Sequence, residues 1–346
     1  MLVINKNNVE YRKSIYIGRS KDGDIMKMRI DKLTIVGDIK DNENKNNFID
    51  AIKKMKPNSK NFFTISNIFI KKKHPYRRSL IFRNKRKEKN MLLRIDFLPL
   101  RKNTGFIRLE FRPQHLSHSQ FDELLTWLNI NTEKVLLKIL KKSWITQLDI
   151  ALDIYNKKLK DNVWGLKNAS SYKKFEKPQG LPGLRIGSHT SKLHFLCYEK
   201  LDLVGRNFKI NDDLIAIENK KIDSFLRIEA RIRPNEKPNK IYHNTIFLKD
   251  IANIKNPFIG LKTYSPSLIC KLEEYSINIS SPSLRIASQE QFLQKDRLLR
   301  ISRNNQRLIQ EYEVSLFDKS LVWNKWCKCQ QHLGDVLNGL CYPLSC

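Results

Sequence analysis

The stretch WITQLDIALDI, residues 144–154, decides the fold class because its apolar and polar side chains alternate along most of its length. Side chains of a strand point alternately to its two faces, so this stretch predicts a strand with one buried face. The apolar face holds Leu148, Ile150, Leu152 and Ile154, and the polar face holds Gln147, Asp149, Ala151 and Asp153. Two carboxylates therefore share one face.

The same alternation recurs in IRLEF at 107–111, KLHFLCYEK at 192–200 and FLRIEARIR at 225–233. Helical spacing appears between and after these strands, in FDELLTWLNI at 121–130, NTEKVLLKILKK at 131–142 and a cationic stretch at 292–312. This order predicts an α+β fold with twisted, mostly antiparallel sheets, flanking helices and a helical C-terminal region.

Two pairs of stretches suggest an internal repeat. FIRLEFRP at 106–113 resembles FLRIEARIRP at 225–234, and SIYIGRSKDGDIMKMRIDKL at 14–33 resembles GLRIGSHTSKLHFLCYEKL at 183–201. A duplication would give two related β-modules, in which Ile30 of the first holds the position of Tyr198 in the second. Chance similarity between short alternating strands is the alternative.

The charge balance points to a polyanionic partner. The chain has 65 lysines and arginines against 35 acidic residues, a formal net charge of +30 that is spread from Lys6 to Lys328. Such a protein should bind DNA or RNA with an affinity that falls steeply as salt rises. No apolar run is long enough to span a membrane, and the N-terminus lacks the apolar segment of a signal peptide, so we expect a cytoplasmic protein.

The strand at 192–200 carries a candidate nucleophile. Alternation places His194, Tyr198 and Lys200 on one mostly polar face. A phenol has a pKa near ~10, so its attack on a phosphodiester needs a neighbouring cation or a metal. Lys200 points the same way as Tyr198 and is the candidate for that cation.

Acids and arginines on the remaining polar faces suggest metal and phosphate binding. We expect Asp149 and Asp153 about 7 Å apart on their strand, where, with Glu229, they could hold a divalent ion such as Mg²⁺ or Mn²⁺. The alternative is that each acid pairs with a lysine or arginine. The expected DNA contacts are Arg227, Arg231, Arg233 and Lys192.

The cysteines and histidines give weaker signals. The six cysteines are Cys197, Cys270, Cys327, Cys329, Cys341 and Cys346, and the last four of them lie in the last twenty residues. His332 could join these four as a zinc ligand. Their spacing matches no standard zinc finger, so free thiols are the favoured interpretation. In HLSH at 115–118, two residues lie between His115 and His118, whereas a paired-histidine metal-binding motif of the HUH kind has one. The simpler interpretation is that Ser117 or Ser119 caps the next helix.

The order of these motifs resembles the Rep_trans-type replication initiators of small rolling-circle plasmids and related phages. The matching pieces are LDIALDI at 148–154, GLRIGS at 183–188, Y-E-K at 198–200 and the R-x-E-x-R strand, within roughly residues 105–235. The resemblance implies a sheet-centred fold related to the HUH nucleases by a doubled module. It also implies a metal-dependent nick at an origin and a 5′-phosphotyrosine intermediate.

Carried over by position, the resemblance makes Tyr198 the nucleophile and Asp149, Asp153 and Glu229 the acids of the site. Gln147 stands where the family tends to have arginine. The expected activity is that of a site-specific DNA endonuclease and strand transferase.

The expected division of the chain is a β-rich module at 1–104 that could recognise DNA, a nicking module at 105–240 and a basic, mainly helical region at 241–346. Besides origin DNA, we consider a host helicase and a homodimer as partners, and no membrane. The rival functions are a non-catalytic origin-binding initiator or regulator and an RNA-binding protein.

Overall fold

The structure of the 346-residue chain is a computed structural model. The described residues are 15–39, 41–70, 74–86, 90–101, 104–167, 169, 171–177, 181–202, 224–234, 245–277 and 309–341.

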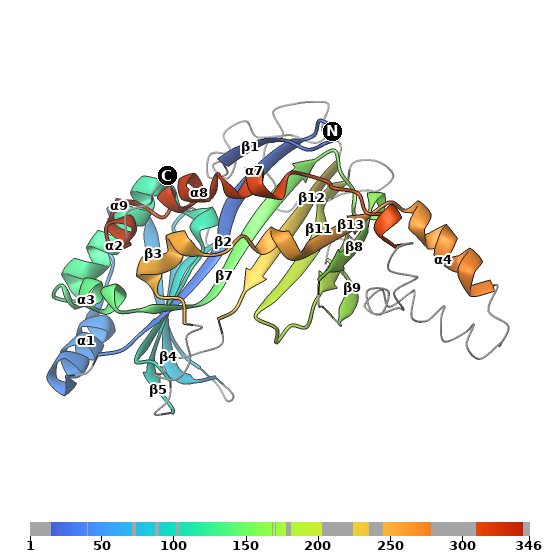
Figure 1. Ribbon diagram of the computed structural model, residues 1–346. Coiled ribbons are helices and arrows are strands. Elements are labelled where there is room, and N and C mark those ends of the chain that lie inside the picture. Colours follow the sequence, from blue (N-terminus) through green and yellow to red (C-terminus); the bar gives the residue numbers. More distant parts are fainter. Residues whose placement is uncertain are drawn as a thin grey trace.

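An 11-stranded antiparallel sheet dominates this part of the chain (Figure 1). Its strand order is β3-β4-β5-β6-β2-β7-β12-β11-β10-β9, and β1 pairs with β2 off this path. The strands are β1 (Ile15–Arg19), β2 (Ile25–Gly37), β3 (Phe63–Phe69), β4 (Tyr76–Asn84), β5 (Met91–Pro99), β6 (Ile107–Phe111), β7 (Trp144–Tyr155), β9 (Tyr172–Glu176), β10 (Pro182–Ile186), β11 (Leu193–Asp202) and β12 (Ser224–Ile232). A separate pair is formed by β8 (Val163–Leu166) and β13 (Leu261–Tyr264).

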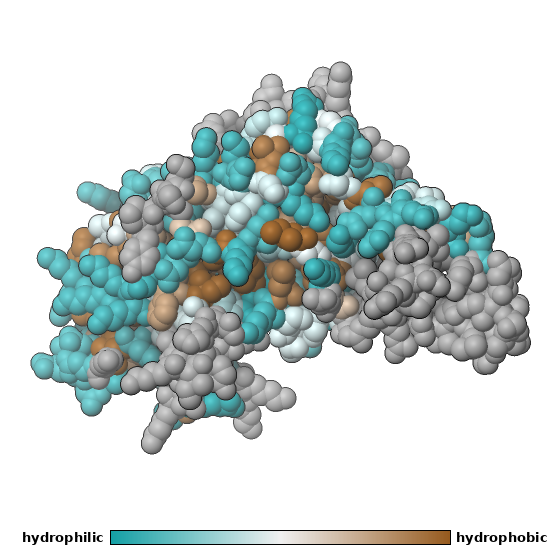
Figure 2. Space-filling model, in the orientation of Figure 1, coloured by the Kyte–Doolittle hydropathy of each residue, from teal (hydrophilic) through white to brown (hydrophobic). Residues whose placement is uncertain are grey.

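Helices accompany the sheet, and several cross one of its faces, which is turned to the viewer in Figure 1. Among the described residues, the α-helices are α1 (Asn42–Lys54), α2 (His118–Asn131), α3 (Val135–Lys141), α4 (Ser267–Ile277), α7 (Lys319–Trp323), α8 (Trp326–Gln331) and α9 (Asp335–Asn338). The 3-10 helices are η2 (Pro113–His115), η3 (Leu159–Asp161), η4 (Leu248–Asn253) and η5 (Pro257–Gly260). The surface seen from this side is largely hydrophilic, with hydrophobic patches near its centre (Figure 2).

The core lies between the apolar face of the sheet and the helices. Phe111 of β6 stacks on Phe121 of α2 with ring centroids 5.2 Å apart, and Phe195 of β11 lies 5.9 Å from Phe258 of η5. Leu148 of β7, on the same face, is fully buried. Because alternate residues of each strand face this core, their polar neighbours must occupy the opposite face of the sheet.

The α+β fold class and the mostly antiparallel sheet are confirmed. The four predicted strands correspond to β6, β7, β11 and β12, and the two predicted helices to α2 and α3. Positive φ angles of 51° at Glu133 and 64° at Lys134 interrupt the helical conformation between α2 and α3. Of the predicted cationic helix at 292–312, all but the last residues lie outside the described part of the chain.

The sheet topology contains a duplication. A first module, β2-β6-β5-β4-β3, and a second module, β7-β12-β11-β10-β9, share one strand order and join where β2 pairs with β7. Arg108 of β6 lies opposite Asp96 of β5, as Arg227 of β12 lies opposite Tyr198 of β11. The expected equivalence of Tyr198 with Ile30 is therefore wrong, because Ile30 lies on β2, the counterpart of β7; Asp96 holds the equivalent position.

The three-part division of the chain stays a prediction. Strand β6, assigned from sequence to the nicking module, pairs with β5 and β2 in a sheet that runs through both modules. Within the described residues, no helix is long and apolar enough to cross a membrane.

The predicted serine cap of α2 is confirmed and supports a stability prediction. Ser117 Oγ accepts a hydrogen bond from Gln120 N at 3.2 Å, and the Gln120 side chain accepts one from Ser117 N at 3.0 Å. We expect Ser117→Ala to lower the free energy of unfolding by about 1 kcal/mol, because it leaves a helix N–H without its partner. Thr126→Ala, at an exposed position of α2, is the control. Urea denaturation that ranks Thr126→Ala as the more damaging change would contradict the capping role.

Candidate active site

The polar face of the second module carries a dense network of charged side chains. Pairing of β12 with β7 places Arg227 opposite Asp153 and Arg231 opposite Asp149. Pairing of β11 with β12 places Tyr198 opposite Arg227. The predicted alternation thus brings Tyr198 and the arginines to the same face as the two aspartates.

Tyr198 is the centre of this network. Its hydroxyl donates a hydrogen bond to Glu229 Oε2 at 3.1 Å, and its side chain is buried, with 4% of the residue exposed. Two ammonium groups lie near its ring, Lys177 Nζ at 3.8 Å and Lys200 Nζ at 5.8 Å from the ring centroid. The predicted association of Lys200 with Tyr198 is present, although a register shift between Glu199 and Leu201 interrupts the alternation there.

Lys177 was missed by the sequence reasoning, and a glycine explains its approach. Gly183 lies opposite both Tyr198 and Phe175 in the sheet. A Cβ atom at this glycine would lie 2.3 Å from the Phe175 ring, so only glycine leaves that ring its present place, 6.4 Å from the Tyr198 ring. Strand β9 thereby brings Lys177, two residues after Phe175, over the tyrosine. The alternation in KKFEK at 173–177 was the available signal.

The electrostatics keep the phenol neutral in this state. Burial, and then the Glu229 charge, raise the pKa of Tyr198 well above its usual value near 10. Burial lowers the pKa of Lys177. The phenol can therefore act as a nucleophile only when a base removes its proton during attack, and Glu229 already accepts its hydrogen bond.

Each acid predicted to bind metal is held by an arginine. Arg227 grips Asp153 in a bidentate pair with distances of 2.6 and 2.8 Å. Arg231 donates to Glu229 at 2.6 Å and to Asp149 at 3.1 Å. Gln147 Nε2 donates to both oxygens of Asp149 at 2.9 Å. The alternative noted from the sequence, pairing of each acid with a basic side chain, describes this state.

These three acids do not fit a shared ion here. The expected separation of about 7 Å is wrong, because Asp149 and Asp153 lie four residues apart on β7, or ~13 Å at ~3.3 Å per residue. Burial, and then Glu229, raise the pKa of Asp149 to about 7. The assignment of Asp149, Asp153 and Glu229 as metal ligands stays a prediction that would need the arginines to move.

Among the described residues, the ligand atoms of another group lie within 4.8 Å of one another: His118, Asp122 and Asp335, a potential metal-binding triad at the junction of α2 and α9. His118 Nε2 lies 3.5 Å from Asp122 and 3.2 Å from Asp335. Asp122 also accepts hydrogen bonds from the backbone N–H groups of Asp335 and Val336, which accounts for its position without an ion.

The described cysteines give no support to a zinc site in the tail. Within the described ranges, Cys197, Cys270, Cys327, Cys329 and Cys341 form no disulfide, and no cysteine joins a metal-type cluster. Burial raises the pKa of Cys329 to about 12 and that of Cys341 to about 11, so both stay protonated at neutral pH. Cys346 lies outside the described residues.

The predicted DNA contacts differ in accessibility. Arg227 is buried with Asp153 and Asp31 and presents no surface to DNA in this state. Arg231 keeps 23% of its side chain exposed. Arg233 donates to the carbonyl oxygen of His189 at 2.6 Å, and Lys192 is exposed. Lys192, Arg231 and Arg233 therefore remain candidates for phosphate contact.

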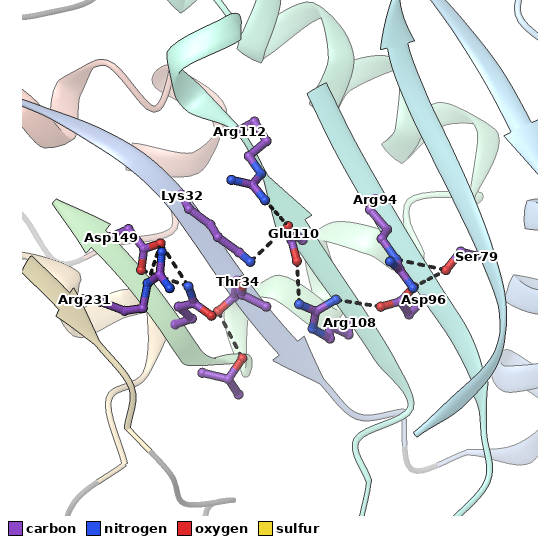
Figure 3. A network of polar contacts seen from close by, with 12 residues as sticks. Lys32, Thr34, Ser79, Arg94, Asp96, Arg108, Glu110, Arg112, Asp149 and Arg231 are labelled. Carbon is purple, nitrogen blue, oxygen red and sulfur yellow. Dashed lines mark hydrogen bonds and ion pairs between the residues drawn. The ribbon is translucent and has the colours of Figure 1, made fainter. Parts of the chain in front are cut away.

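The polar face of the first module carries a matching ion network (Figure 3). Arg108 bridges Asp96 and Glu110, each at 2.6 Å, and Arg94 donates to Asp96 at 2.6 Å. Glu110 also pairs with Arg112 at 2.8 Å and Lys32 at 3.0 Å. The R-x-E-x-R pattern is thus common to both modules, but this one has an aspartate where the second has Tyr198.

Glu110 should make the free energy of unfolding depend on pH. Burial would raise its pKa, but the charges of Lys32, Arg108 and Arg112 outweigh burial and lower the pKa to about 2. Because the folded-state pKa lies below the ordinary value of 4.5, this stabilisation is present above that value and disappears as pH falls through about 2.

Glu110→Gln should therefore lower the free energy of unfolding, relative to the wild-type protein, by about 2–3 kcal/mol at pH 7. This loss should shrink toward zero near pH 2. Chemical denaturation at several pH values measures it, with Glu43→Gln on α1, exposed, as the control. A deficit independent of pH would contradict the assigned ion pairs.

Comparisons with known proteins do not assign a family. No family model and no curated protein matches the chain. A solved rolling circle replication initiator protein from Geobacillus stearothermophilus is similar at 15% identity and a TM-score of 0.32, over 60% of this chain and 74% of that protein. A likeness of this degree leaves the function to be argued from the geometry of the site.

Proposed function

We propose that this protein is a DNA-binding replication initiator that nicks one strand at an origin through attack by Tyr198. The observation that carries the proposal is the hydrogen bond from the Tyr198 hydroxyl to Glu229 at 3.1 Å, beside Lys177 and Lys200. A nucleophile bonded to a base, which Arg231 in turn orients, is the arrangement that covalent catalysis requires.

The attack by Tyr198 is a transesterification at phosphorus, which a divalent ion, where one is bound, would assist by polarising the phosphate. The Tyr198 oxygen bonds to phosphorus while its proton passes to Glu229, and the bond from phosphorus to the 3′ oxygen of the preceding nucleotide breaks. That oxygen takes a proton from water and becomes a 3′-hydroxyl, which can prime synthesis, and the other strand end stays linked as a 5′-phosphotyrosine. The phosphodiester energy is retained for rejoining.

The formal charge of +30 supports DNA as the substrate, because it supplies sequence-independent affinity for phosphates. Tyr198 is only 4% exposed, so a strand reaches its hydroxyl only after the side chains over it, including Lys177, shift. This burial favours a second candidate function, a non-catalytic DNA-binding initiator or regulator that recruits host enzymes.

A cleavage assay separates the two functions. Purified protein is incubated with a labelled pool of random-sequence single strands, with Mg²⁺, with Mn²⁺ or with EDTA, and run on a denaturing gel. The proposal predicts label that migrates with the protein and is released by protease. Binding without any covalent label under all three conditions would favour the non-catalytic function. Loss of the label in EDTA alone would bring the predicted metal into the mechanism.

A further inference from the structure

We infer that the first-module arginine cluster, Arg94, Arg108 and Arg112, grips the phosphate backbone of the DNA that the second module cuts. The inference rests on the proposed function for its choice of DNA and adds a surface to it. The first module would hold the substrate, and the second would carry the nucleophile.

The accessibility of the cluster distinguishes it from an ordinary buried ion network. The side chains of Arg94, Arg108 and Arg112 are 24%, 20% and 29% exposed, whereas those of Asp96 and Glu110 are 0% and 8% exposed. The acids thus lie beneath the arginines and fix their orientation, while part of each guanidinium side chain reaches solvent. Oriented guanidinium groups suit bidentate phosphate contacts.

The charges do not cancel. Four cations, the three arginines and Lys32, surround two carboxylates, which leaves a surplus of two positive charges. Arg108 and Arg112 both donate to the Glu110 carboxylate, at 2.6 and 2.8 Å, so their guanidinium groups lie side by side. One phosphate group, or two neighbouring ones of a strand, could therefore contact both arginines.

The duplication connects this cluster to the candidate site. Arg108, Glu110 and Arg112 occupy the places of Arg227, Glu229 and Arg231 in the second module, and the polar face continues across β2 and β7 to Asp149 and Arg231 (Figure 3). With Asp96 at the position of Tyr198, the first module retains the basic side chains but has no nucleophile there. A binding role accounts for what remains.

The test measures affinity separately from nicking. Fluorescence anisotropy of the full chain with a labelled mixed-sequence DNA strand, between about 50 and 200 mM NaCl, gives the dependence of log affinity on log salt. The variant Arg94→Gln/Arg108→Gln/Arg112→Gln should weaken binding by about tenfold or more and reduce the slope by ~2–3, because each lost phosphate contact removes ~0.7–0.9.

The matched control Lys53→Gln/Lys54→Gln/Lys138→Gln removes three charges from exposed positions of α1 and α3. Equal losses of slope in both triple variants, or no loss in the arginine variant, would overturn the inference. Thermal melts followed by circular dichroism establish that each protein is folded.

A second variant keeps the test decisive if the arginine triple variant fails to fold. Glu110→Gln disturbs the same network but adds to the positive surplus, so DNA affinity should be maintained or rise although stability falls. A folded Glu110→Gln protein whose affinity drops about tenfold with an unchanged salt slope would overturn the inference, because no phosphate contact would have been lost. Tyr198→Phe should bind with the wild-type slope, so failure of the cleavage proposal and failure of this one remain distinguishable.

Discussion

Tyr198→Phe is expected to abolish the covalent protein–DNA adduct, a loss of at least about 10³-fold, because it removes the oxygen that attacks phosphorus. The ring and its neighbours Lys177 and Phe175 are retained, and Glu229 keeps its pair with Arg231. The fold should survive with a loss of about 1 kcal/mol for one hydrogen bond. Adduct formation is measured on denaturing gels.

The control for this substitution is Tyr76→Phe on β4. Tyr76 is equally buried in the same sheet and donates to the carbonyl oxygen of Gly105 at 2.9 Å. The control should lose a similar amount of stability and retain the adduct. Full adduct formation by Tyr198→Phe would remove this tyrosine from its role, and equal loss in both variants would attribute the effect to folding.

Arg227→Met should cause the largest loss of stability, about 3–5 kcal/mol, because it leaves buried carboxylates without their partner. Arg227 is 1% exposed and pairs with Asp153 and, at 3.1 Å, with Asp31. Burial would raise the pKa of Asp31, but Arg227 and Arg29 outweigh it and lower the pKa to about 2. Chemical denaturation at pH 7 measures the loss.

Two further proteins make this prediction specific. Arg227→Met/Asp153→Asn should recover part of the stability, since one of the unpaired charges is gone. Arg77→Met, at an exposed position of β4, should change the free energy of unfolding by no more than about 0.5 kcal/mol. If Arg227→Met and Arg77→Met have the same free energy of unfolding, the buried ion pairs of Arg227 do not stabilise the fold.

Local alternation was enough to predict the strands that carry the site. In β7, β11 and β12 a period of two separates core residues such as Ile150 from polar ones such as Asp149, and this pattern needs no knowledge of the neighbouring strand. The same pattern correctly placed Tyr198 and Glu229 on one face. It could not show that this face is buried.

Strand pairing was the missing information. The metal prediction assumed that Asp149 and Asp153 face an ion, whereas the antiparallel register places Arg231 and Arg227 opposite them. The two aspartates are four residues apart, and so are the two arginines, and this equal spacing was a signal that the sequence did contain. The order of the modules could not be predicted from the sequence either, because β2 and β7 pair across more than a hundred residues. Nor could the position of Lys177 over the Tyr198 ring, which depends on the space left by Gly183.

The most direct test of the central claim is to locate the linked nucleotide in the wild-type protein. After reaction with DNA, the complex is digested with nuclease and protease, and the peptides are sequenced by tandem mass spectrometry. The proposal predicts a nucleotide joined through phosphate to Tyr198. A nucleotide on another residue, or none in a protein that still cleaves DNA, would contradict it.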